Sequence, residues 1–86
     1  MKEVKMFMMA TCPHCKRAFS MMEELCAEHP EYKGVKVETI DETERPDYAE
    51  QFDYYYVPTF YVGDEKMCEG VPSKDAIDKV YQEACK

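Results

Sequence analysis

The sequence has few basic residues and no long hydrophobic run. Eleven Lys and Arg residues stand against 18 Asp and Glu residues, so the net charge of the 86 residues is -7. No basic cluster longer than Lys16-Arg17 exists to neutralise phosphates, so we expect neither nucleic acid nor an anionic membrane as a partner. The first ten residues carry several charges, and no apolar stretch is long enough for a signal sequence or a membrane span. We therefore expect a cytoplasmic protein.

The chain also lacks internal repeats, linkers and low-complexity segments. A chain of 86 residues can bury one hydrophobic core but not two independent ones. The sequence therefore predicts a single domain over residues 1–86 with one functional site. We expect this domain to act as a monomer.

The cysteines do not form the pattern of a secreted, disulfide-rich protein. Their number, five, is odd, and the only tight pair is Cys12 and Cys15. Cys26, Cys68 and Cys85 fall at apolar-periodic or strand positions, where a buried thiol behaves as a small hydrophobe. We expect these three to pack in the core of a protein from a reducing compartment.

The first half of the chain predicts a strand, a helix and a second strand. Residues 4–9 form a nearly continuous apolar run, which is typical of a strand buried on both faces. Apolar residues then recur at helical spacing from Pro13, which suits a first helical turn, until Pro30. Residues 35–40 alternate as in a strand, so the two strands should run parallel with a right-handed crossover.

The second half predicts a short helix, a hairpin and a final helix. Thr43 is a suitable N-cap for the short helix, and Ser73 for the final amphipathic one. Residues 59–62 and 66–70 flank a Gly-Asp-Glu turn and read as antiparallel strands. The predicted fold class is α/β, with a four-stranded mixed sheet flanked by helices.

Two cysteine-containing pairs offer a metal-site alternative. Cys12 and Cys15 are followed by Cys26 and His29, a four-ligand set with the spacing of some zinc sites. A helix between the pairs would separate them by roughly 16 Å, whereas zinc holds its ligands at about 2 Å. We therefore expect no zinc site. The dithiol alone could still hold a soft ion such as Cu(I).

The position of Cys12 before a helix indicates redox chemistry. Free backbone N–H groups and the positive end of the helix dipole stabilise a thiolate there and lower its pKa. Pro13, which begins the helix, and the imidazole of His14 are expected to tune this pKa, and Lys16 adds positive potential. Cys15 lies one helical turn further on, close enough to act as the resolving thiol.

Two remaining segments have simpler interpretations. The acidic run over residues 41–50 is interpreted as a solvated helix start, favoured by negative charge near the helix N-terminus. One or two of the three successive tyrosines at 54–56 should pack in the core and leave their hydroxyls in water. An aromatic rim for substrates is the alternative role of these tyrosines.

Two motifs, "CPHCKRA" and "YVPTFYVGDEKMCEG", resemble the glutaredoxin branch of the thioredoxin superfamily. The resemblance implies a thioredoxin-like fold, a cis Pro58 beside the dithiol, and a Val57 backbone that pairs with an extended substrate. Two features differ from glutaredoxins. His14 replaces the usual tyrosine, as in periplasmic disulfide oxidases, and "EGVPSKD" replaces the Gly-Gly and Asp that hold glutathione. The second half is more similar to thioredoxin.

Together these features predict a thiol-disulfide oxidoreductase that reduces protein or small-molecule disulfides through Cys12 and Cys15. We expect no bound metal or organic cofactor, and electrons supplied by glutathione or by a flavoprotein thioredoxin reductase. The alternative is a binding module, in which the dithiol captures Cu(I) or senses redox state without turnover.

Overall fold

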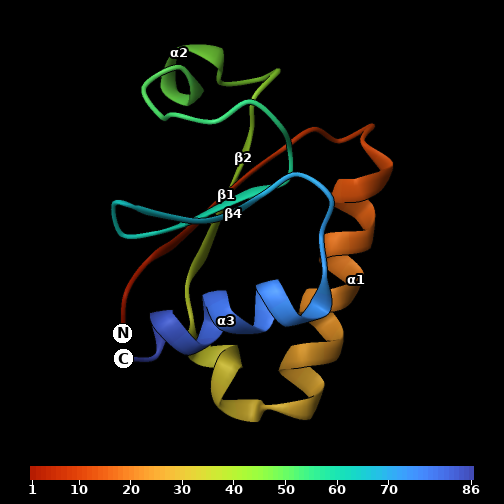
Figure 1. Ribbon diagram of the computed structural model, residues 1–86, viewed down its shortest axis with the longest axis vertical. Helices are drawn as coiled ribbons and strands as arrows, with labels where there is room; N and C mark the ends of the chain where they lie inside the picture. Colours follow the sequence, from red (N-terminus) through yellow and green to blue (C-terminus); the bar gives the residue numbers. More distant parts are fainter.

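The computed structural model describes all residues from 1 to 86, which form one mixed four-stranded sheet with helices around it (Figure 1). The elements are β1 (Val4–Met8), α1 (Pro13–Glu28), the 3-10 helix η1 (Pro30–Gly34), β2 (Val37–Asp41), α2 (Pro46–Ala49), β3 (Thr59–Val62), β4 (Glu65–Glu69) and α3 (Lys74–Ala84). The strand order is β2-β1-β3-β4. β1 pairs parallel with β2 and antiparallel with β3, and β3 pairs antiparallel with β4. The predicted α/β class and mixed sheet are confirmed.

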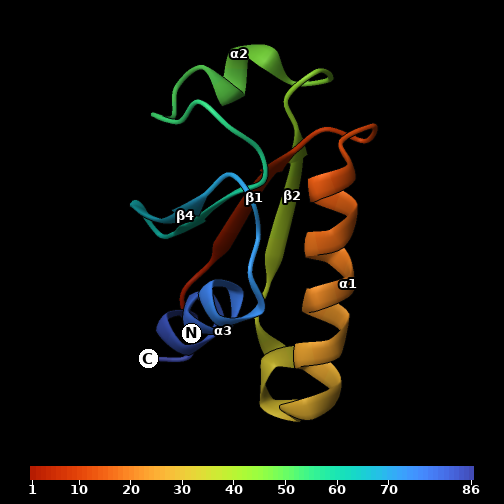
Figure 2. The ribbon, with the colours of Figure 1, turned by 45° about the vertical axis from the view of Figure 1, so that its right-hand side comes forward.

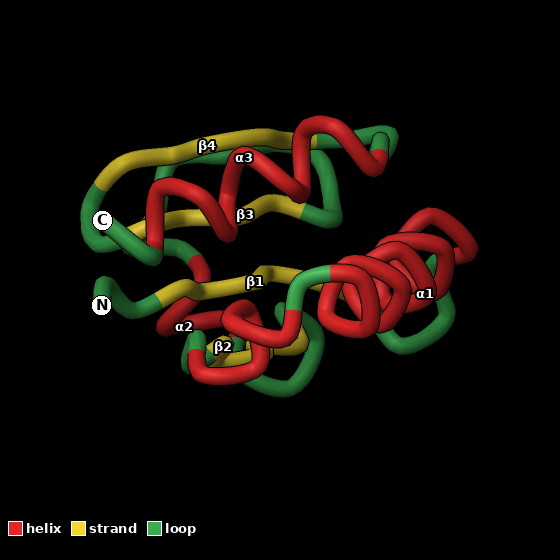
Figure 3. Tube along the Cα trace, turned by 90° about the horizontal axis from the view of Figure 1, so that it is seen from below, coloured by secondary structure: helices red, strands yellow, loops and turns green.

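Alternation of side chains along β1 divides the core between the two faces of the sheet. Val4 and Met6 point to the face that α1 and α3 cover, where they join a cluster of 12 buried residues. Figure 3 shows the strands in order, with α3 crossing β3 and β4 and α1 beside it. Phe7 points to the opposite face. β1 is therefore buried on both faces, as its apolar run predicts.

The second face of the sheet carries a smaller, mostly aromatic cluster. Phe7 lies at its centre, with ring centroids 4.7 Å from Phe52, 4.9 Å from Tyr54 and 5.9 Å from Tyr61. The segment that contains α2 supplies most of these rings. Figures 1 and 2 place α2 at the opposite end of the molecule from α3. The aromatic cluster thus attaches an otherwise irregular segment to the sheet.

The predicted cap of the short helix is wrong. α2 begins at Pro46, and no side chain caps it. The Thr43 hydroxyl instead donates to Asp41 Oδ1 at 2.6 Å, and its backbone N–H donates to the same oxygen at 2.9 Å. Thr43 therefore belongs to a turn closed by Asp41, because that carboxylate lies nearer in sequence than the free N–H groups of α2.

The cap of the last helix is as expected. Ser73 Oγ accepts from the Ala76 backbone N–H at 3.1 Å, so α3 begins where the sequence predicts. The far end of α3 meets the chain start, where the Lys2 N–H donates to the Ala84 carbonyl at 2.7 Å. Both termini accordingly lie side by side in Figures 1 and 2. None of the helices has the length and apolar character needed to cross a membrane.

Replacing Phe7 with alanine tests how much the aromatic cluster stabilises the fold. Phe7 is fully buried, and its loss leaves a cavity among four rings, so we expect the free energy of unfolding to fall by about 3–5 kcal/mol. Urea unfolding followed by circular dichroism measures this. Val71→Ala, at a position 70% exposed, is the control and should change stability by less than about 0.5 kcal/mol. A loss from Phe7→Ala no larger than that of the control would contradict the packing argument.

Candidate dithiol active site

Cys12 lies at the N-terminus of α1, in the segment that connects β1 to this helix. Cys12 is the N-cap residue, with extended backbone angles, and Pro13 occupies the first helical position. The next two backbone N–H groups, of His14 and Cys15, have no partner inside the helix. Both lower the pKa of the Cys12 thiol, although its sulfur makes no capping hydrogen bond to the helix.

The environment of Cys12 favours its thiolate. Desolvation acts in the opposite direction and is the largest single influence, but the N–H and S–H groups of Cys15 and the N–H of His14 outweigh it together. The net result is a pKa of Cys12 below its ordinary value of 9.0. The thiol is also partly exposed, so a substrate disulfide can reach it.

Cys15 has the opposite character. It is only 1% exposed, and burial raises the pKa of its thiol to about 11, to which the neighbouring Cys12 thiolate adds. The free S–H of Cys15 donates to the Cys12 sulfur. At neutral pH this arrangement pairs a partly exposed thiol of lowered pKa with a buried, protonated one.

His14 acts on Cys12 through its backbone rather than through a ring contact. Nδ1 of the imidazole lies 3.4 Å from Nη1 of Arg17, one turn along the helix. Lys16 and Arg17 are exposed. The effect of the His14 ring itself on the thiolate stays a prediction, since the backbone N–H that lowers the Cys12 pKa is common to any residue except proline.

A loop before β3 lies beside His14. The Val57-Pro58 peptide bond is cis, Pro58 is buried, and Val57 is partly exposed. An open groove of about 300 Å³ brings His14 together with Tyr56, Val57 and Val71. The structure therefore places the Val-Pro segment and the dithiol helix on one surface, although 43 positions separate His14 from Val57 in the sequence.

Glu69 holds this loop in place from the end of β4. Its Oε2 accepts from the backbone N–H groups of both Tyr55 and Tyr56, the latter at 2.9 Å, and its Oε1 lies 2.9 Å from Lys66 Nζ. The Lys66 contact and the two N–H groups lower the pKa of Glu69 to about 2. Glu69 is not among the predicted site residues, because nothing local in its strand indicates a partner 13 or 14 residues away.

A second acidic residue near the dithiol was also missed. The Glu42 carboxylate accepts from the Tyr54 hydroxyl at 2.8 Å, and its backbone N–H donates to the Met8 carbonyl at 3.0 Å, so it follows directly after the sheet. Burial and, to a smaller extent, the negative charge of Glu42 oppose the lowering of the Cys12 pKa, and the same two effects contribute to the raised pKa of Cys15. The one sequence signal for Glu42 is its place soon after residues 35–40, a strand predicted to pair with residues 4–9.

The other cysteines lie away from the dithiol. Cys26 and Cys68 are partly buried against the larger core cluster, and the Cys26 thiol lies 3.7 Å from the Tyr81 hydroxyl. Burial raises the pKa of the Cys68 thiol to about 11. Packing is therefore the observed role of these two. For Cys85 the prediction is wrong, because α3 ends at Ala84 and leaves Cys85 exposed.

The four residues considered for zinc do not converge. α1 runs unbroken from Pro13 to Glu28, which leaves Cys26 and His29 at the opposite end of the helix from the dithiol. His29 lies 3.8 Å from Glu31 instead. No group of three or more His, Cys, Asp or Glu side chains is arranged to hold a metal ion.

The fold and the paired thiols define a class of protein, the thiol-disulfide oxidoreductases of thioredoxin-like fold. Sequence comparison agrees: a family model described as a thioredoxin domain matches residues 2–82. The chain is also 32% identical, over 75 residues, to a thioredoxin from Methanocaldococcus jannaschii, an alignment that covers 87% of this chain and 86% of the relative. The chain therefore belongs to the thioredoxin family.

Solved structures show the same fold. Mitochondrial thioredoxin 3 from Saccharomyces cerevisiae, in its oxidized form, superposes with a TM-score of 0.73 at 24% identity, covering 95% of this chain and 77% of that one. Reduced desulfothioredoxin from Desulfovibrio vulgaris Hildenborough superposes with a TM-score of 0.68 at 21% identity, covering 95% of this chain and 80% of that one. A glutaredoxin from Archaeoglobus fulgidus superposes with a TM-score of 0.63 at 26% identity, covering 93% of this chain and 86% of that one. The thioredoxin-like fold is therefore confirmed, and it is a fold that the glutaredoxin shares.

Two substitutions of Cys15 test the hydrogen bond that its thiol donates to Cys12. Cys15→Ala removes the S–H donor and should raise the pKa of Cys12 above the wild-type value, whereas Cys15→Ser keeps an O–H donor and should raise it less. The rate of Cys12 alkylation by iodoacetamide, followed against pH by peptide mass spectrometry, gives the pKa. Identical profiles for the two variants would contradict a role for the donor.

Glu69→Gln tests the loop anchor through its pH dependence. The folded-state pKa, about 2, lies below the ordinary 4.5, so the carboxylate stabilises the fold above about pH 4.5 and loses this effect as the pH falls towards 2. The free energy of unfolding of wild type should therefore exceed that of Glu69→Gln at neutral pH, and the difference should shrink in acid. Urea unfolding at about pH 7 and about pH 3 measures both. A difference that stays constant would count against the anchor, and Glu65→Gln, at an exposed position of the same strand, should change little at neutral pH.

Proposed function

We propose that this protein reduces disulfides of proteins and small molecules through a Cys12/Cys15 dithiol mechanism. The observation that carries the proposal is the unequal environment of the two thiols. Cys12 is partly exposed, with a lowered pKa, and Cys15 is buried, with a pKa of about 11. A binding module that never resolves a mixed disulfide has no need of this asymmetry.

The proposed reaction transfers two electrons in two exchanges. The Cys12 thiolate attacks one sulfur of the substrate disulfide, which forms a mixed disulfide and releases the other substrate sulfur as a thiolate. Cys15 then loses its proton and attacks the Cys12 sulfur. The second substrate thiolate leaves, both substrate thiols take up protons, and the protein keeps an internal Cys12–Cys15 disulfide.

The groove beside His14 is the proposed place for the substrate chain. Tyr56 and Val71, which are 69% and 70% exposed, offer apolar surface, and the partly exposed Val57 can present its backbone to an extended segment. Pro58, which follows, has no N–H group and leaves no competing donor at that position. Substrates with an extended chain beside the disulfide fit this surface.

Regeneration requires two electrons from an external donor. Glutathione and a flavoprotein thioredoxin reductase are the two candidate donors, and the protein itself is proposed to hold no metal or organic cofactor. The segment "EGVPSKD" lacks the Gly-Gly and Asp pattern of glutathione-binding relatives. We therefore favour the flavoenzyme, and NADPH consumption with each reducing system compares the two.

Single-cysteine variants test the mechanism. Cys15→Ser should accumulate stable mixed disulfides with a substrate such as insulin, because no thiol remains to resolve them, and Cys12→Ser should accumulate none. Insulin reduction should fall by at least about 1,000-fold in Cys12→Ser. Non-reducing electrophoresis and a turbidity assay measure these outcomes.

Two results would contradict the proposed mechanism. Mixed disulfides on Cys12→Ser but not on Cys15→Ser would reverse the assignment of the attacking thiol. A wild-type protein that binds Cu(I), but reduces neither insulin nor hydroxyethyl disulfide with any donor, would replace the reductase with the binding module.

A further inference from the structure

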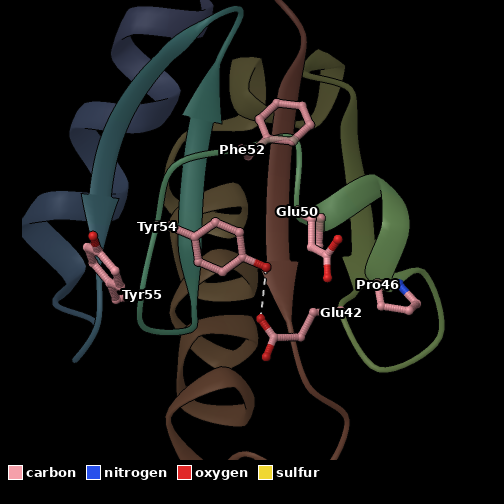
Figure 4. Close-up of a pocket in the computed structure, with 7 residues that line it drawn as sticks. Glu42, Pro46, Glu50, Phe52, Tyr54 and Tyr55 are labelled. Atoms are coloured by element: carbon pink, nitrogen blue, oxygen red, sulfur yellow. Dashed lines mark hydrogen bonds between the residues drawn. The ribbon is translucent and has the colours of Figure 1, made fainter.

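A second pocket opens at the same end of the sheet as the dithiol. It lies between the end of β2, α2 and the loop that follows α2, and its volume is about 440 Å³. Phe52, Tyr54 and Tyr55 supply aromatic walls, and Glu42 and Glu50 supply two carboxylates. Figure 4 shows the Glu42 carboxylate turned toward the Tyr54 hydroxyl, with the Glu50 side chain nearby on the α2 side of the pocket. The pocket therefore combines negative charge with aromatic surface.

The acidic side of this pocket is held in position. The Tyr54 hydroxyl donates to Glu42 Oε1 at 2.8 Å, and the Tyr54 ring stacks on buried Phe7 at a centroid distance of 4.9 Å. The Glu42 backbone is bonded to the Met8 carbonyl. A carboxylate fixed from both ends loses little conformational freedom when a ligand binds to it.

The carboxylates in the pocket have no counter-charge from this chain. Neither Glu42 nor Glu50 forms an ion pair with a basic side chain. Arg45, on the same segment, is directed elsewhere: its Nη1 lies 3.5 Å from Glu38, and its guanidinium lies 4.5 Å above the Tyr48 ring. The site thus presents unneutralised negative charge to an incoming group.

The backbone around Asp41 connects the pocket to the segment that leads to the dithiol. Met8 pairs with Asp41 in the sheet, and the Ala10 N–H on the path to Cys12 donates to Asp41 Oδ2 at 3.2 Å. Glu42 is the next residue. Burial, which is the larger effect, and the charge of Glu42 both act against the groups that lower the pKa of the Cys12 thiol. A cation placed against Glu42 would offset that charge while a substrate is bound.

We propose that this pocket binds the guanidinium group of an arginine that lies beside the disulfide of a protein substrate. The protein would then select disulfides in basic surroundings, a substrate class that rests on the reductase function proposed above. A guanidinium pairs with carboxylates through two parallel hydrogen bonds and stacks on aromatic rings, so it suits both kinds of wall. Lysine, a point charge without a planar face, is expected to bind less well.

Matched peptide disulfides test the selectivity. Disulfide-linked peptide dimers carry self-quenched fluorophores, and they differ only in having arginine or its neutral isostere citrulline near the cysteine. Pre-reduced wild-type protein should reduce the arginine peptide about fivefold faster, and added salt should decrease the ratio. A ratio near one at low salt would overturn the proposal.

Two single-charge variants separate the pocket from the general field of the protein. Glu50→Gln should bring the arginine-to-citrulline ratio close to one. Glu44→Gln removes the same charge from the same exposed segment but lies outside the pocket, so its ratio should match that of wild type. Equal losses in the two variants would show that net charge, rather than the pocket, sets the ratio.

A peptide without a disulfide tests the pocket apart from the redox reaction. The probe is the arginine peptide with serine in place of cysteine. Its addition should shift the amide NMR signals of residues 42–55 of the wild-type protein, and should not shift those of Glu50→Gln. Such shifts in a protein that reduces neither peptide would support the pocket and reject the reductase. Reduction of both peptides at equal rates without these shifts would reject the pocket and support the reductase.

Discussion

The effect of the free N–H groups at the start of α1 on the Cys12 thiol is the interaction on which the site depends. Burial of a thiolate is unfavourable, and only the N–H groups of His14 and Cys15, with the Cys15 thiol, bring the pKa of Cys12 below 9.0. These donors exist because a helix leaves its first N–H groups without internal partners. Everything that holds α1 against the sheet therefore also maintains the chemistry of Cys12.

Negative charge around the dithiol is divided between two glutamates with different effects. Glu69 pairs with Lys66 and accepts hydrogen bonds from two backbone N–H groups, so it orders the loop before Val57. Glu42 has only the Tyr54 hydroxyl as a polar side-chain partner, and its field reaches the thiols. The first glutamate positions the surface on which a substrate chain is proposed to lie. The second opposes thiolate formation until something neutralises it.

Local signals predicted most of the fold, and they failed at two residues whose immediate surroundings differ from the expected ones. The apolar run of residues 4–9, the helical spacing after Pro13 and the Ser73 cap each act within a few residues, and each element is present. Thr43 and Cys85 were misread for one reason: a sequence pattern shows that a residue can cap or pack, but not which neighbour occupies its side chain first. The Thr43 hydroxyl bonds to Asp41 instead of capping α2, and Cys85 is exposed because α3 ends at the residue before it.

The sequence by itself determined the dithiol, because two cysteines at this spacing after a strand must share one helical turn, and the helix terminus supplies the N–H donors wherever the chain begins to coil. Only the tertiary structure decided what surrounds it. The groove between His14 and Val57, the Glu69 anchor and the pocket closed by Glu42 and Tyr54 join segments that are far apart along the chain or linked by irregular loops. Their meeting follows from strand pairing and from the aromatic cluster around Phe7, which act only once the sheet has formed.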